Sequence, residues 1–270
     1  MSAQETVSPS RFASDGGAIL ALWQRDLKHL ARERTRWLGV VIQPLLIWAL
    51  LGLGMGDVFK VEGLEGLDYL TFFYPGVIVM VILFTTVFAT MAVIEDRTQG
   101  FLQQMAVAPA SRGSMVLGKV AGVTTVAMVQ AVLCLAVAPL AGFSLGSIAW
   151  PALIAALILG SVGLTSLSFC LAWLVTSTHA YHALMSVLLL PLWMVSGAMF
   201  PAPESGVVRV IMDLNPMTYS VEALRHALHG GVSEVSAMTP AFSMIALTGF
   251  AVGMTGVAIW LTTRVQRWRP

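Results

Sequence analysis

The stretch that decides the fold class is Phe72-Phe-Tyr-Pro-Gly-Val-Ile-Val-Met-Val-Ile-Leu-Phe-Thr-Thr-Val-Phe-Ala-Thr-Met-Ala-Val-Ile94. A helix needs about 20 largely apolar residues to cross a bilayer, because each residue adds about 1.5 Å to its length. This run is long enough, and it contains no Asp, Glu, Lys, Arg or His. The sequence therefore predicts that residues 72–94 span a membrane as a helix.

Five further apolar runs have comparable lengths. They are Trp37–Met55, Met115–Ala141, Ala149–Val175, Ala180–Phe200 and Phe242–Thr262. None shows the alternating pattern of barrel strands. Over the whole chain 57% of residues are apolar and 11% are charged, whereas soluble domains average about 25% charged. A disordered chain would need low hydrophobicity and high charge. We therefore expect an all-α integral membrane protein with six transmembrane helices.

Basic residues predict which ends of these helices face the cytoplasm. Of the 15 basic residues, 12 lie before the first span, in or just after the loop between spans two and three, or in the C-terminal tail. The other side holds only Lys60, Arg209 and Arg225. Because cytoplasmic loops carry an excess of Lys and Arg, both termini are predicted to be cytoplasmic. The net charge of +1 gives no reason to expect a nucleic-acid partner.

This topology predicts a simple domain organisation. Residues 1–36 form a cytoplasmic N-terminus, residues 37–262 the six-span domain, and residues 263–270 a basic cytoplasmic tail. Within the N-terminus, residues 18–36 read as an amphipathic helix at the membrane surface. Its expected apolar face is Leu20, Trp23, Leu27 and Leu30, and its expected polar face is Gln24, Arg25, Lys28 and Arg32. Residues 56–71 form an acidic outer loop, and residues 95–114 a polar cytoplasmic loop.

Residues 201–239 are too polar to span a membrane and too apolar for a free loop. Pro201 and Pro203 are expected to stop the fifth span. Asn215-Pro216 has the pattern of an N-cap followed by proline in the first helical turn. A helix face of Met217, Val221, Leu224 and Leu228 follows, before Gly230-Gly231. Two short helices that dip into the outer leaflet are the expected structure.

Catalytic and metal sites find little support in the sequence, so we expect no enzyme activity and no bound cofactor. Gly113–Val120 resembles a phosphate-binding loop, but Val120 stands where that loop needs a hydroxyl and no strand precedes it. Lys119 is the ionisable residue that lies inside a span, and its stem is long enough to reach the interface. The two cysteines, Cys134 and Cys170, lie in apolar runs and read as packing residues.

The spans contain scattered hydroxyl and amide groups in place of buried charges. Ion-coupled carriers usually need such charges, so that class is disfavoured. Most of these polar groups are expected to bond their own or a neighbouring helix, and the alternative is a weakly polar path for an amphipathic cargo. Gly52-x-x-x-Gly56, Gly118-x-x-x-Gly122 and Gly249-x-x-x-Gly253 offer close packing within the chain or between chains.

Two segments, together with the order of the spans, carry a family resemblance. The first is Glu95-Asp96-Arg97-Thr98-Gln99-Gly100-Phe101-Leu102-Gln103-Gln104-Met105, followed by Pro109 and Gly118-Lys119. The second is Asn215-Pro216-Met217-Thr218-Tyr219-Ser220-Val221-Glu222-Ala223-Leu224-Arg225 before the last span. With a basic amphipathic helix, six spans and both ends inside, the chain resembles a type-2 ABC transporter permease, the membrane subunit of bacterial drug, lipid and polysaccharide exporters.

The resemblance implies a homodimer of twelve spans in the bacterial inner membrane, docked on two copies of an ABC ATPase that bind ATP and magnesium. The loop after span two would be the coupling helix seated in the ATPase. Its implied interface residues are Glu95, Asp96, Arg97, Gly100, Phe101, Leu102 and Met105. The apolar Phe101, Leu102 and Met105 with a charged rim also have the composition of a docking surface, although packing on the chain's own cytoplasmic ends is an equal reading from the residues alone.

The resemblance also implies a cargo path and an outer cap. The path would be lined by spans two and five, with Phe84, Thr85, Phe88, Trp193 and Met194 as candidates. The outer re-entrant segment would contain Asn215, Pro216, Tyr219, Glu222 and Arg225. The expected cargo is an amphipathic small molecule or lipid. A membrane scaffold or assembly factor that transports nothing is the alternative, and an ion-coupled carrier is a further one.

Overall fold

The computed structural model describes residues 11–32, 34–55, 68–98 and 111–264, and within these ranges every regular element is a helix. The α-helices are α1 (Arg11–Arg32), α2 (Arg34–Met55), α3 (Tyr69–Thr98), α5 (Arg112–Leu135), α6 (Trp150–Leu174), α7 (Thr178–Leu184), α8 (Leu190–Trp193), α9 (Val207–Leu214), α10 (Pro216–Leu228) and α11 (Pro240–Arg264). A 3-10 helix, η1 (Ala138–Ala141), and two π-helical segments, η2 (Met185–Leu189) and η3 (Met194–Ala198), complete the described elements.

Five helical segments are long and apolar enough to cross a membrane. They are Tyr69–Arg97, Arg112–Leu135, Trp150–Leu174, Thr178–Ala198 and Pro240–Arg264, and Gly39–Met55 is a shorter apolar helix. The prediction of an all-helical membrane protein is therefore confirmed, with five candidate spans in the described part of the chain. Each lies close to one of the six predicted runs.

Helix α3 forms the centre of the bundle. It packs against α2, α5, α6 and α10. The side chains from Phe72 to Leu83 are almost entirely buried. A helix that is apolar on all sides is stable only when other helices or lipid surround it. The run that decides the fold class is therefore also the core of the molecule.

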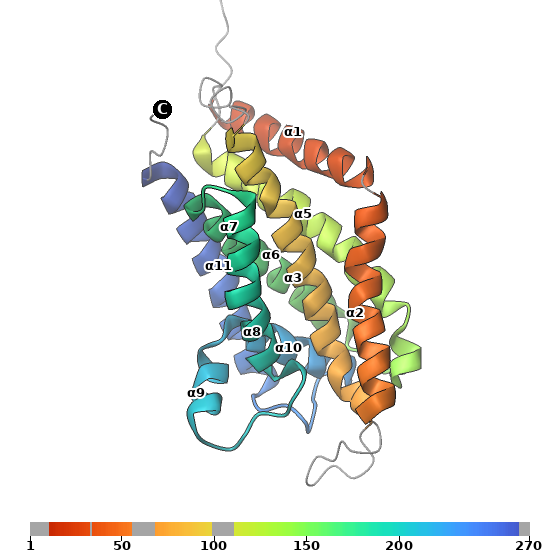
Figure 1. Ribbon diagram of the computed structural model, residues 1–270. Coiled ribbons are helices and arrows are strands. Elements are labelled where there is room, and N and C mark those ends of the chain that lie inside the picture. Colours follow the sequence, from red (N-terminus) through yellow and green to blue (C-terminus); the bar gives the residue numbers. More distant parts are fainter. Residues whose placement is uncertain (1–10, 33, 56–67, 99–110, 265–270) are drawn as a thin grey trace, which may run out of the picture.

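The two ends of the bundle hold different elements (Figure 1). The C-terminal ends of α3 and α11 and the N-terminal end of α5 lie at one end, and α1 crosses the bundle there. We call this the loop end, because α3 and α5 flank residues 99–110. Helices α9 and α10 lie at the opposite end, which we call the outer end. The chain thus places α1 and the end of α11 on one side, as the predicted topology requires.

Two predicted spans end earlier in the structure than in the sequence analysis. The third was expected to reach Ala141, but α5 ends at Leu135. Pro139 explains this end, because a proline ring clashes with the carbonyl group four residues before it. The fifth was expected to run to Phe200 and stop at the prolines that follow. Its helical part ends at Ala198, because Gly197 already has a left-handed backbone with φ of 78°.

The fifth span is irregular along its length. Thr178–Ala198 consists of α7, η2, α8 and η3, so α-helical and π-helical turns alternate, and Pro191 lies in α8. Neighbouring side chains bind some of its carbonyl groups: Asn215 Nδ2 donates to Leu192 O at 2.5 Å, and Arg225 Nη2 donates to Gly197 O at 2.7 Å. Such irregular backbone is tolerated at membrane depth where other groups satisfy it. Single π turns inside helices are frequent at functional sites.

The outer segment contains the two short helices that the sequence predicts. Asn215 caps α10 by accepting a hydrogen bond from Met217 N at 3.0 Å, and Pro216 occupies the first turn. The predicted face of Met217, Val221, Leu224 and Leu228 is buried. In contrast, α9 exposes most of its apolar side chains.

Helix α1 differs from the predicted amphipathic helix in its start and in one face. It begins at Arg11 rather than near residue 18 and ends at Arg32. Leu20, predicted on the apolar face at the membrane surface, is 53% exposed. Leu22, Trp23 and Asp26 instead face α5. The sequence analysis did not predict this packed face, because Asp26 was not recognised as a residue that faces α5. The side chains of Leu30 and Arg32 lie outside the described residues.

Candidate functional site

Two glycines of α5 allow α1 to approach closely at the loop end. A Cβ atom at Gly118 would lie 3.0 Å from Leu22 Cβ, and one at Gly122 would lie 3.0 Å from Asp26 Cβ. Real Cβ atoms rarely come that close, so larger residues at either position would displace α1. The small-residue motif Gly118-x-x-x-Gly122 therefore packs two helices of the same chain.

A buried ion pair lies beside this glycine contact. Lys119 Nζ is 3.0 Å from Asp26 Oδ2, and the side chains of Lys119 and Asp26 are only 9% and 6% exposed. Lys119 therefore has a partner inside the protein, Asp26 of α1, which the sequence analysis did not identify. Trp23 strengthens the same contact, since its Nε1 donates to Thr125 Oγ1 at 3.0 Å.

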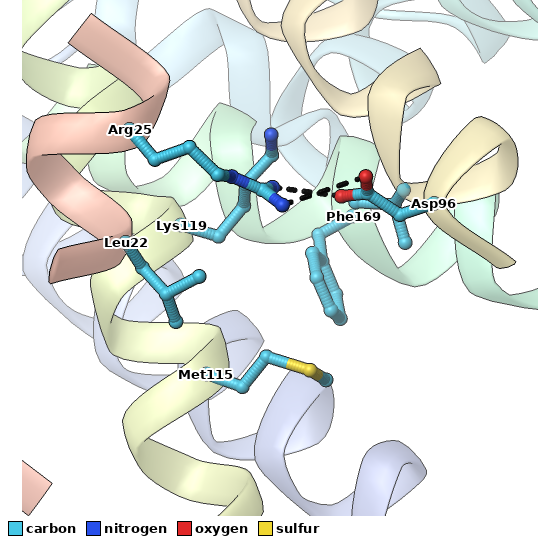
Figure 2. Close-up of a pocket in the computed structure, with 7 residues that line it drawn as sticks. Leu22, Arg25, Asp96, Met115, Lys119 and Phe169 are labelled. Carbon is cyan, nitrogen blue, oxygen red and sulfur yellow. Dashed lines mark hydrogen bonds and ion pairs between the residues drawn. The ribbon is translucent and has the colours of Figure 1, made fainter. Parts of the chain in front are cut away.

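A second ion pair joins α1 to the end of α3. Arg25 Nη2 lies 2.7 Å from Asp96 Oδ2, and these side chains are 35% and 22% exposed. Figure 2 shows the Arg25 guanidinium group directed at Asp96, with Lys119 beside it. Burial disfavours the charged form of Arg25, but the hydrogen bond to Asp96 and the charges of Asp96 and Asp26 outweigh it and raise the pKa of Arg25.

A small cavity adjoins the two ion pairs. Its volume is about 20 Å³, and it is lined by Leu22, Arg25, Val93, Asp96, Met115, Lys119 and Phe169 (Figure 2). A cavity of this size holds about one water molecule. The site is therefore too small for a cargo molecule, and its charged groups serve contacts between helices.

Both sides of the loop 99–110 are fastened to other helices. On the α3 side, Arg97 donates to Trp173 O at 3.0 Å and also to Val175 O, at the end of α6. On the α5 side, Asp15 of α1 accepts from Ser111 N at 2.6 Å and from Ser114 Oγ at 2.7 Å. Arg112 Nη1 donates to Thr262 O of α11 at 2.9 Å. The base of this loop is therefore tied to α1, α6 and α11.

The predicted ATPase-coupling residues are only partly described. Glu95, Asp96 and Arg97 form the last turns of α3, where Asp96 and Arg97 make the contacts given above. Gly100, Phe101, Leu102 and Met105 lie outside the described residues, so their part in an interface stays a prediction.

Two of the predicted outer residues, Glu222 and Arg225, form a second buried ion pair. Arg225 Nη1 lies 2.6 Å from Glu222 Oε1, and the two side chains are 3% and 2% exposed. Arg225 also lies over the Phe72 ring at 4.7 Å. Burial lowers the pKa of Arg225, whereas the charge of Glu222 and the hydrogen bond to it act in the opposite direction. Tyr219 OH donates to Asp213 O, next to the Asn215 cap.

Glu222 and its neighbour on α10 hold the segment that leads into α11. The second carboxylate oxygen of Glu222 accepts from Ala237 N at 3.1 Å and from the Ser236 hydroxyl group. One turn later, His226 Nδ1 accepts from Ser233 N at 2.9 Å. Polar contacts from Glu222 and His226 therefore hold the segment between α10 and α11 against the outer end.

The five candidate path residues divide into buried and surface positions within the single chain. Phe84, Thr85 and Trp193 are buried. Thr85 donates to Gln130 Oε1, and Trp193 Nε1 donates to Gly76 O at 2.9 Å. Met194 is 40% exposed, and partly buried Phe88 packs on Phe84 at a centroid distance of 6.3 Å. The lining of a cargo path by these residues stays a prediction.

The segment that resembles a phosphate-binding loop has a different structure. Gly113–Val120 lies within α5, and Lys119 is paired with Asp26. Among the described residues, no group of three His, Cys, Asp or Glu side chains is placed to hold a metal ion.

Comparison with known proteins adds the family to this geometry. Residues 17–229 match the model of the ABC-2 type transporter family, from within α1 to just beyond α10. The chain belongs to the ABC-2 type transporter family. It is 30% identical to the transport permease ycf38 of Cyanophora paradoxa over 213 residues, which cover 77% of this chain and 72% of that protein. It is 27% identical to nodulation protein J of Rhizobium meliloti over 237 residues, covering 80% of this chain and 83% of that protein.

Family membership identifies the chain as a multi-pass membrane subunit of a transporter. An ABC-2 type permease implies an ABC ATPase as its partner. The matched region includes both segments that carry the resemblance, the end of α3 with its loop and the Asn215 segment. The prediction of the family from those segments is confirmed.

Sequence reasoning missed the polar contacts that dock α1 in this ABC-2 type permease. Asp26 was not identified, and Lys119 was assigned to the interface. One signal was present: Leu22, Trp23 and Asp26 lie at i, i+1 and i+4 on one face, so an acidic residue follows two apolar ones towards the packed side. A lysine one residue after Gly118 supplies the complementary charge. An acidic residue on the packed face of one helix and a lysine inside a span are therefore candidates for an ion pair.

Proposed function

We propose that this chain is the membrane subunit of an ATP-driven exporter in the bacterial inner membrane. Two copies form the translocation path, and two copies of a separate ABC ATPase bind ATP and magnesium and supply the energy. The proposed cargo is an amphipathic small molecule or lipid. The ABC-2 family match supports the ATPase partner, and spans that hold hydroxyl groups and few charges support an amphipathic cargo.

The proposed topology has both termini in the cytoplasm and six spans within residues 37–262. The gathering of basic residues near the loop end and in the N- and C-terminal segments supports it. Helix α2 would be the first span: it has 22 residues, which is about 33 Å at the rise of an α-helix. Helices α9 and α10 would form the re-entrant cap, and the exposed Val207, Val210 and Leu214 of α9 would enter the outer leaflet.

The proposed coupling element is the segment Glu95–Met105, docked in the ATPase as a short helix. The observation that carries this proposal is the fastening of the loop base to α1, α6 and α11 by Asp15, Arg25, Arg97 and Arg112. A force applied to a loop with a free base would bend the loop alone. With this base, the same force acts on several helices at once.

Reconstitution with the ATPase tests the proposed function. The chain is expressed with a candidate ABC ATPase, purified through a tag on the chain and placed in lipid vesicles. We expect the ATPase to co-purify in equal amount and to hydrolyse Mg-ATP at a rate different from that of the ATPase alone. An ATPase that does not associate supports a membrane scaffold instead. Transport that persists without ATP and follows an ion gradient supports an ion-coupled carrier.

A further inference from the structure

Four charged side chains of alternating sign form a row at the loop end. Lys119 of α5 lies 3.0 Å from Asp26, Asp26 lies 3.4 Å from Arg25, and Arg25 lies 2.7 Å from Asp96 of α3. The row therefore runs from α5 through α1 to α3. We call Asp26–Lys119 the anchor pair and Arg25–Asp96 the clasp pair.

The two pairs differ in their surroundings. The anchor pair is buried, and on either side of it α1 is pressed against Gly118 and Gly122 and bonded through Trp23. The clasp pair is reached by solvent and borders the cavity of about 20 Å³. Removing one partner of a buried ion pair is costly, because the other charge is left without water. An exposed pair opens readily, because water replaces the lost contact.

The remaining contacts at the loop end divide in the same way. Asp15 binds Ser111 and Ser114, so α1 is held to α5 near the start of α5 as well as at the anchor pair. Arg97 holds the end of α3 to the end of α6. The clasp pair therefore joins α1, which is held on α5, to the end of α3, which is held to α6, close to residues 99–110. Helix α5 is also packed on α3 and bonded to α11 through Arg112.

We infer that the anchor pair stays closed throughout the transport cycle, whereas the clasp pair opens and closes as the ATPase moves the loop. Arg25 and Asp96 are thus positioning residues that determine the position of the end of α3 relative to α1. The inference rests on the proposed coupling of this loop to an ATPase. Asp96 precedes the end of α3 by two residues, so a displacement of the loop acts on the clasp pair before it reaches the anchor pair.

Reversible crosslinks distinguish the two pairs. The native cysteines are first replaced by Cys134→Ala and Cys170→Ala. The clasp is then closed covalently in the variant Arg25→Cys with Asp96→Cys by a short bis-methanethiosulfonate reagent that spans the former ion pair. The same reagent fixes α1 to α5 in a second variant, Asp15→Cys with Ser114→Cys, whose native side chains are joined by a hydrogen bond of 2.7 Å. Both variants are assembled with the ATPase in vesicles, and Mg-ATP hydrolysis is measured before and after reduction.

The crosslinked clasp should lower the rate of ATP hydrolysis at least tenfold, and dithiothreitol should restore it. The α1–α5 crosslink should change the rate less than twofold. Full turnover with the clasp crosslinked would overturn the inference, and so would reversible arrest by the α1–α5 crosslink. A wild-type chain that fails to associate with the ATPase would instead refute the proposed function.

Discussion

The loop end and the outer end of this permease use the same chemistry with different exposure. At the loop end, Asp26–Lys119 is buried but Arg25–Asp96 is partly open and borders a cavity. At the outer end, Glu222–Arg225 is sealed, and both groups make further hydrogen bonds to the backbone. The loop end joins separate long helices, whereas the outer end fixes α10 to the segments beside it.

This difference indicates which contacts between helices can break at a small cost in free energy. Breaking an exposed ion pair costs about 0–1 kcal/mol, whereas removing one partner of a buried pair costs about 3–5 kcal/mol. We therefore expect the loop end to change its contacts during transport and the outer network to stay intact as a unit. Four predictions test this comparison, in order of decreasing effect.

The first prediction establishes which end faces outwards, and its effect is all-or-none. In a background without Cys134 and Cys170, which are free and buried, an impermeant maleimide should label Ser205→Cys in intact cells but not Ser8→Cys. Ser8→Cys should become labelled after lysis, which is the control for its reactivity. The reverse pattern in intact cells would invert the whole topology.

The second prediction concerns the outer pair. Glu222→Gln leaves the buried Arg225 charge without its partner, so the free energy of unfolding should fall by about 3–5 kcal/mol. Thermal or denaturant unfolding in detergent measures this loss. Glu204→Gln is the matched control, because Glu204 is exposed in the same outer segment. The double variant Glu222→Gln with Arg225→Met should recover much of the stability; equal losses in the single and double variants would mean that the ion pair is not the cause.

The third prediction concerns the clasp pair at the loop end. Arg25→Gln removes the partner of Asp96, but solvent reaches both groups, so we expect a smaller loss of about 1 kcal/mol. The same unfolding measurement applies. Lys28→Gln serves as the control, since Lys28 is exposed on the same helix. A loss equal to that of Glu222→Gln would contradict the proposed difference between the ends.

The fourth prediction concerns the region between the ends and has the smallest expected effect on structure. Phe88→Ala should leave assembly with the ATPase intact, because Phe88 is only partly buried. It should alter the stimulation of ATP turnover by cargo, as expected of a residue that lines the path. If transport is unchanged in alanine variants of Phe84, Thr85, Phe88, Trp193 and Met194, these residues do not form the path.

The sequence predicted the helical membrane fold, the capped helix after Asn215 and the family, because each depends on composition or on local pattern. Apolar length predicts spans, and Asn-Pro predicts a cap, without knowledge of neighbours. The pairing of Asp26 with Lys119 depends on how α1 is rotated against α5, and the periodic pattern of α1 alone does not specify that rotation. The early end of the fifth span depends on the left-handed backbone conformation of Gly197. A glycine permits this conformation but does not require it.

The central claim, that the loop end is the coupling end, depends most directly on Phe101. We expect the segment Glu95–Met105 to place Phe101 in the ATPase, where a buried aromatic anchor contributes about 2 kcal/mol or more to binding. Phe101→Asp would put an unpaired charge there, so the tagged variant, assayed for membrane level and co-purified ATPase, should insert normally but lose the ATPase and export. Normal association and normal export by this variant would show that the loop is not the coupling element.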